Sequence, residues 1–157
     1  MLEPEHVELL ESPCALIVGT VDADLVPDAT RGWGAALEAD GARIRVLLAS
    51  NAERALANLA GEGRIALTAT NMVTYSSVQV KGRAVAIGPV DADDTIRFDR
   101  FCAGVVRTIA EIEGASEDLV RRMIPPGIVA CTMTVDEVFD QTPGPAAGNR
   151  LAPVDVR

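Results

Sequence analysis

Hydrophobic and polar residues alternate regularly over residues 77–83, SVQVKGR. Successive side chains point to opposite faces of a β-strand, so this pattern predicts a strand with one face on a core and one polar face. After Gly82 the pattern reverses, because Val85 and Ile87 continue the polar face as apolar residues. We expect one long strand over residues 73–88 that bends at the glycine, as strands do where they cross a barrel. An ordinary surface strand would show the same polar face.

Other parts of the chain also have the apolar content and flanking turns of strands. These stretches are residues 14–21, 26–38, 43–49, 64–70 and 128–138. Cap residues and apolar positions three or four residues apart predict helices. The helices are expected over residues 4–11, 50–60, 91–112 and 116–124. Six strands in antiparallel runs, with helices inserted after the third and before the last, predict a mainly β fold, a six-stranded split β-barrel with helical covers.

The chain has 157 residues and shows no repeat, so a single domain over residues 1–157 is expected, with an irregular tail over 142–157. No stretch approaches the roughly 20 apolar residues of a membrane span. The amino terminus is acidic and shows no export signal, so we predict a cytoplasmic protein without membrane contact.

Composition excludes several kinds of site. The formal net charge of −9 argues against nucleic-acid binding, which requires a concentrated basic face. His6 is the only histidine, which removes most histidine-dependent nucleophile and metal schemes. The three cysteines are far apart and flanked by apolar residues, so we expect buried thiols and no metal site.

Candidate binding residues are few. Ser50 and Glu53 have the spacing of a capping box, and a helix start with Arg54 on its first turn could bind a phosphate. An ordinary helix cap with a solvated arginine would give the same pattern. Arg31 lies in an apolar stretch. It could belong to a binding site, or it could lie at the rim of a barrel, where arginines also occur. Trp33 could stack on a planar ligand or fill the core.

Taken together, these segments resemble the pyridoxamine 5'-phosphate oxidase-like FMN-binding split-barrel family. The similarity covers about residues 10–139 and is carried by Arg31-Gly32-Trp33, by Leu47-Leu48-Ala49-Ser50 leading into Glu53-Arg54-Ala55, and by Ser77-Val78-Gln79-Val80-Lys81-Gly82. The family implies a homodimer with FMN in a groove between subunits. By position, the resemblance assigns cofactor contacts to Arg31, Gly32, Trp33, Leu48, Ala49, Ser50, Arg54, Ser77 and Gln79.

The tail departs from the true oxidases, because it has Arg150 but no histidine to grip a substrate phosphate. We therefore expect an FMN-dependent oxidoreductase that does not oxidise pyridoxamine phosphate, with no catalytic side chain assigned. The alternatives are a non-catalytic module for a flavin or another planar ligand, and a dimeric barrel that has lost its cofactor. With a single histidine, haem is disfavoured, and the acidic composition disfavours a deazaflavin with an anionic tail.

Overall fold

The computed structural model describes residues 2–151 of the chain. The strands are β1 (Ala15–Val21), β2 (Pro27–Leu37), β3 (Arg43–Ala49), β4 (Arg64–Thr70), β5 (Ser77–Gly88), β6 (Ile128–Thr134) and β7 (Glu137–Asp140). The helices are α1 (Pro4–Glu11), α2 (Glu53–Gly61), α3 (Ala92–Glu113) and α4 (Glu117–Arg121). Among the described residues, no helix is long and apolar enough to span a bilayer.

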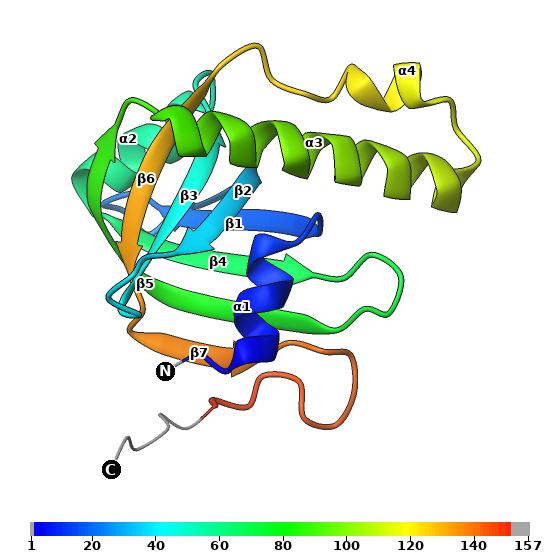
Figure 1. The fold of residues 1–157 in the computed structure, drawn as a ribbon. Coiled ribbons are helices and arrows are strands. Elements are labelled where there is room, and N and C mark those ends of the chain that lie inside the picture. Colours follow the sequence, from blue (N-terminus) through cyan, green and yellow to red (C-terminus); the bar gives the residue numbers. More distant parts are fainter. Residues whose placement is uncertain (1, 152–157) are drawn as a thin grey trace.

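Six strands close into an antiparallel barrel (Figure 1). The order is β4-β1-β2-β3-β6-β5, and pairing between β4 and β5 closes the ring, while β7 adds to the free side of β5. The predicted fold class, a mainly β six-stranded barrel with helices, is confirmed. The strand that spans the split is β5, because Ser77–Arg83 pair with β4 and Ala84–Gly88 pair with β6.

Gly82 is required where β5 changes partners. A Cβ at this position would overlap with the backbone carbonyl of Thr134 on β6, so only glycine permits this approach. A register shift follows between Ala84 and Ala86. The bend that the sequence predicts at Gly82 thus coincides with the crossing of two strands.

The barrel interior is aliphatic. Leu16, Val46, Leu67, Val80 and Met133 are fully or almost fully buried there. The short helices close the interior, since α1 contributes Leu10 and α2 contributes Leu59 to the same core cluster.

Helix α3 covers the outer face of one half of the barrel. Its Cys102 packs with Trp33 of β2, Leu47 and Ala49 of β3 and Ala130 of β6. The helix extends well beyond the edge of the sheet (Figure 1), which leaves its last turns less covered and Ile112 49% exposed.

Some predicted boundaries are wrong. The long strand begins at Ser77, not at residue 73, because Asn71 Oδ1 accepts hydrogen bonds from the backbone of Val73 and Thr74 and folds this segment into a turn. The stretch 128–138 forms two strands, since the chain turns at residues 135–136 from β6 to the edge of β5.

The predicted capping box at Ser50 is also wrong. Helix α2 begins at Glu53 with Ala52 as its N-cap residue and has no side-chain cap. The predicted helix 116–124 is the shorter α4, capped by Ser116. Of the expected tail, residues 152–157 lie outside the described part, and Arg150 forms a bridge with Phe139.

Candidate functional site

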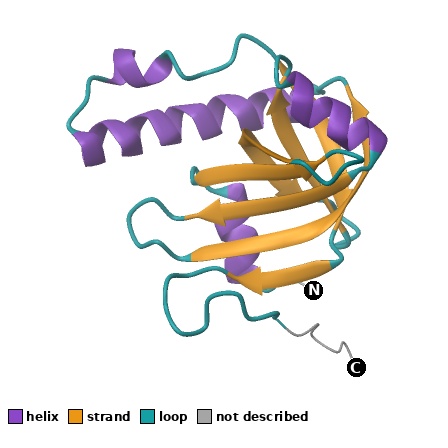
Figure 2. Ribbon diagram, turned by 180° about the vertical axis from the view of Figure 1, so that it is seen from behind, coloured by secondary structure: helices purple, strands orange, loops and turns teal. Residues whose placement is uncertain are grey.

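The outer face formed by the first part of β2, up to Arg31, and by β1, β4, β5 and β7 carries no helix. In Figure 2 these strands face the viewer, and α1 lies behind them on the interior side. Ile17 of β1 is 38% exposed on this face, whereas its neighbours Leu16 and Val18 point into the core. We call this surface the bare face.

Strand register brings Arg31 and Gln79 into one row on the bare face. Arg31 pairs with Ile17, which pairs with Thr68, which pairs with Gln79. Gln79 Nε2 donates to Thr68 Oγ1 at 2.9 Å. Among the described residues, no carboxylate forms an ion pair with Arg31. The row therefore presents a guanidinium on β2 and an amide on β5, with Ile17 of β1 and Thr68 of β4 between them.

Gly32 and Trp33, predicted on the same strand, are buried. A Cβ on Gly32 would contact the Leu16 side chain at 2.7 Å, so this glycine is needed for packing inside the barrel. Trp33 is only 6% exposed and packs beneath α3. Of the two roles that the sequence allowed for Trp33, stacking on a ligand or filling the core, the structure shows the second.

The end of β3 contributes mostly buried residues. Leu48 points into the barrel core and Ala49 packs beneath α3. Ser50 is exposed, and its backbone N–H donates to Gly127 O at 2.9 Å. Among these predicted contacts, only the Ser50 side chain is accessible from outside.

Arg54 lies on the first turn of α2, as expected. Its guanidinium is exposed and approaches Asp22 at 3.9 Å, the outer limit of an ion pair. Because α2 has no side-chain cap, the backbone N–H groups of its first turn have no side-chain acceptor. Positive charge and backbone donors therefore occur together at this helix start.

Ser77 is buried at the start of β5 and its hydrogen bonds are made within the fold. Its hydroxyl lies 2.6 Å from Thr70 Oγ1 and donates to Ala69 O at 3.2 Å. The side chain of Thr142 accepts the Ser77 backbone N–H. These contacts fix the base of the β4–β5 hairpin, and the predicted cofactor contact of Ser77 stays a prediction.

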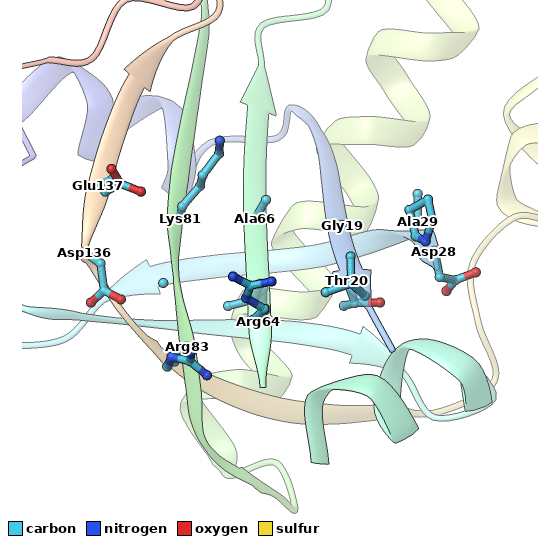
Figure 3. A pocket seen from close by; sticks show the side chains of 14 residues that line it. Gly19, Thr20, Asp28, Ala29, Arg64, Ala66, Lys81, Arg83, Asp136 and Glu137 are labelled. Carbon is cyan, nitrogen blue, oxygen red and sulfur yellow. The ribbon is translucent and has the colours of Figure 1, made fainter. Parts of the chain in front are cut away.

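An open groove of about 920 Å³ adjoins the row on the bare face (Figure 3). Residues with small side chains form its floor, because Ala29, Gly19 and Ala66 lie in register on β2, β1 and β4. Arg64 of β4 also lines it, and sequence reasoning had not singled this residue out. Arg64, Ala66 and Thr68 occupy alternate positions of one strand, and this alternation is the sequence pattern that places Arg64 on the same face as Thr68.

A second polar hollow lies on the opposite side, between β3 and the start of α3. The Asp94 carboxylate is 1% exposed and accepts hydrogen bonds from Arg45 Nε at 2.9 Å and Arg97 Nη1 at 2.7 Å. Burial alone would raise the pKa of Asp94, but the hydrogen bonds from Arg45 and from the Asp91 backbone hold it below its ordinary value. This fully partnered cluster fixes α3 to the sheet. Three acids stand at the start of this helix, Asp91 as its N-cap residue and Asp93 and Asp94 in its first turn.

The thiols are poor nucleophiles. Burial raises the pKa of Cys14 to about 12 and those of Cys102 and Cys131 to about 11. All three are buried and free, as the sequence predicted. Within residues 2–151, no group of His, Cys, Asp and Glu side chains has an arrangement that could hold a metal ion.

Several solved structures share this fold. Group A Streptococcus HupZ has a TM-score of 0.57 at 17% identity, covering 94% of this chain and 100% of that one. An F420 reductase has a TM-score of 0.58 at 15% identity, covering 87% and 98%. A putative pyridoxamine 5'-phosphate oxidase from Lactobacillus delbrueckii has a TM-score of 0.54 at 19% identity, covering 88% and 93%.

Family comparison is more specific than these structural similarities. No curated protein sequence matches the chain. A family model described as pyridoxamine 5'-phosphate oxidase matches residues 2–140, which include every strand and helix of the barrel. The chain therefore belongs to the pyridoxamine 5'-phosphate oxidase family.

Proposed function

We propose that this protein is an FMN-binding oxidoreductase that acts as a homodimer, with the cofactor on the bare face. The observation that supports this proposal most is the row that places Arg31 and Gln79 on one accessible surface. Side-chain donors on a fixed sheet can orient the polar edge of a planar ring. Family membership supplies the reason for choosing a flavin among planar ligands.

The available donors suit the two ends of FMN. Arg31 and Gln79 would hydrogen-bond the ring edge, and the first turn of α2 with Ser50 and Arg54 would hold the phosphate. Hydride transfer is the chemistry that FMN supplies when bound. The protein's own contribution is to orient the ring and to tune it through these hydrogen bonds, so we assign no catalytic side chain.

A second copy of the chain would complete this site. Ile17 of β1 is a large apolar residue that is exposed on the bare face. Covering apolar surface of this kind favours association. We therefore place the dimer contact over the bare face, so that each groove becomes a cleft between two subunits.

Pyridoxamine phosphate is not the proposed substrate. Arg150 is the one basic residue of the described tail, and it pairs with Glu137 at 3.3 Å. No second cation stands beside it within that segment to grip a substrate phosphate. We therefore propose a substrate other than pyridoxamine phosphate.

A cytoplasmic location remains a prediction from the sequence.

The second candidate is a binding module without catalysis. The approach of Arg54 to Asp22 favours it, because this contact competes with a bound phosphate. Such a module would hold FMN without exchanging electrons with a nicotinamide donor.

A visible absorption spectrum of the purified protein tests the proposal first. Flavin bands that are bleached by NADH or NADPH and return with an acceptor support the oxidoreductase, while bands that resist both donors support the binding module. A protein that shows no flavin bands, even after incubation with FMN, contradicts both. Haem and deazaflavin have different spectra and are detected in the same measurement.

Replacing Arg54 by Ala should weaken FMN binding by about 1–3 kcal/mol, the range for a hydrogen bond to a charged group. Fluorescence titration of FMN measures this loss. Arg107→Ala is the matched control, because Arg107 is exposed on α3 away from the bare face. Unchanged affinity in Arg54→Ala would remove this residue from the site.

A further inference from the structure

The groove on the bare face collects positive charge on a strongly acidic chain. Arg64 of β4 and Arg83 of β5 are direct partners in the antiparallel ladder. Lys81, the only lysine of the chain, lies two residues from Arg83 on the same face of β5. In Figure 3, Arg64 and Arg83 occupy adjacent strands, and Lys81 stands above them with its ammonium pointing away from both.

This arrangement is unfavourable without a counter-charge. Directly opposite residues in an antiparallel pair have Cβ atoms about 4.5–5.5 Å apart, and like charges there destabilise the pair. Arg83 Nη1 donates to Glu62 O at 3.0 Å, which satisfies one hydrogen bond but does not neutralise the charge. Lys81 Nζ lies 4.4 Å from the ring centroid of Phe139. Neither contact provides an anion. Glu137 of β7 is the ladder partner of Lys81, but its carboxylate forms its ion pair with Arg150.

Six of the ten other arginines within residues 2–151 form ion pairs with acidic side chains. Those that form ion pairs are Arg43, Arg45, Arg54, Arg97, Arg121 and Arg150. Within the described residues, Arg64, Lys81 and Arg83 form no ion pair, although acidic side chains outnumber basic ones in the sequence. The cations of the groove are therefore available to a ligand.

The acidic residues that line the groove stand at its margins. Asp28 lies beyond β1 from the cations, and Asp136 and Glu137 lie on the opposite side, beyond β5 (Figure 3). Glu137 is held by Arg150 at 3.3 Å. Between these margins the floor is formed by glycine and alanine, so a ligand can approach the three cations without displacing a large side chain.

We propose that this groove binds a small molecule through a phosphate or carboxylate group held between Arg64, Lys81 and Arg83. Guanidinium groups match the planar geometry of such oxyanions, and the ammonium adds a compact charge. The site is separate from the start of α2, where the phosphate of FMN is expected, and it does not depend on flavin binding.

Isothermal titration calorimetry on flavin-free protein at low ionic strength tests the proposal, with inorganic phosphate, pyrophosphate and citrate as probes. We expect saturable binding of at least one probe. Arg64→Gln and Lys81→Gln should each weaken it by about 10-fold or more, as expected for loss of a charged hydrogen bond. Arg83 is left unchanged, because its contact with Glu62 also supports the fold.

Arg107→Gln on α3 is the control, and it should bind like the original protein. No saturable binding of any probe would overturn the proposal, as would an equal loss in the control. The proposal would also be overturned if Arg64→Gln changed the sedimentation coefficient of the protein but not its affinity for the probe. That result would assign the cations to the contact between subunits.

Repeating the titration with FMN or riboflavin present identifies the source of the anion. Competition with FMN but not with riboflavin would show that the groove holds the phosphate of FMN itself. Binding that persists beside FMN would show that it holds a separate anionic molecule. Because the first titration uses flavin-free protein, absence of FMN binding and absence of anion binding are distinguished.

Discussion

The two halves of the barrel wall carry different residues on their outer faces. Under α3 the outer residues are apolar, such as Trp33 and Leu47, and they are buried. On the bare face they are Arg31, Thr68 and Gln79, and they stay accessible. One continuous barrel therefore has one face that packs against its own helix and one face that is available for binding.

A single strand connects the two faces. The first half of β5 lies between β4 and β7 on the bare side, and its second half pairs with β6 on the covered side. Gly82 stands between these halves. The strand β5 thus contributes both to the covered face and to the bare face. Substitutions on the covered face should mainly change stability, and substitutions on the bare face should mainly change binding.

The largest contrast is expected between Trp33→Ala and Ile17→Ala. Removing a buried Trp beneath α3 should lower the free energy of unfolding by about 3–5 kcal/mol, from lost burial and the cavity left behind. Ile17 is already 38% exposed, so its truncation should cost about 1 kcal/mol or less. Urea unfolding of both variants measures the difference. Equal losses would show that the bare face is as important for stability as the covered face.

Gly82→Ala should have the next largest effect. The added methyl group meets the backbone of Thr134, so β5 and β6 must separate, at a cost of about 3 kcal/mol. Gly88→Ala on the same strand is the control, because nothing lies within 4 Å of its added Cβ. Thermal unfolding of the two variants compares them. If both have the same midpoint, the close crossing at Gly82 does not constrain the barrel.

Asp94→Asn should destabilise the covered face by about 2 kcal/mol, because Arg45 and Arg97 lose their shared carboxylate. The pKa of Asp94 is lowered in the folded protein, so its stabilisation is present above the unfolded value, about 4, and is lost as the pH falls through the folded value. The variant should therefore lose less stability on acidification below about pH 4. Asp93→Asn, on the exposed side of the same turn, should keep the original acid profile in unfolding experiments.

The sequence predicts the barrel well because its strands have clear alternation and tight turns. β3 and β4 have the predicted boundaries, and Gly82 marks the strand crossing. Boundaries were missed where side chains redirect the backbone, as Asn71 does in the turn before β5. Such contacts between turn residues leave no periodic signal.

The candidate site was less predictable than the fold. Strand register decides which residues are neighbours, and no pattern within β2 indicates that Arg31 lies in one row with Gln79 of β5. Burial of Trp33 depends on the placement of α3, which is distant in sequence. The pairing of Arg64 with Arg83 likewise appears only once the barrel closes.

Amide chemical shifts recorded while FMN is titrated into flavin-free protein test the division into two faces most directly. We predict saturable changes concentrated at Arg31, Thr68 and Gln79 and at the start of α2, with little change in β6 beneath α3. Changes concentrated beneath α3, or no changes at saturating FMN, would contradict the assignment of the bare face to flavin binding.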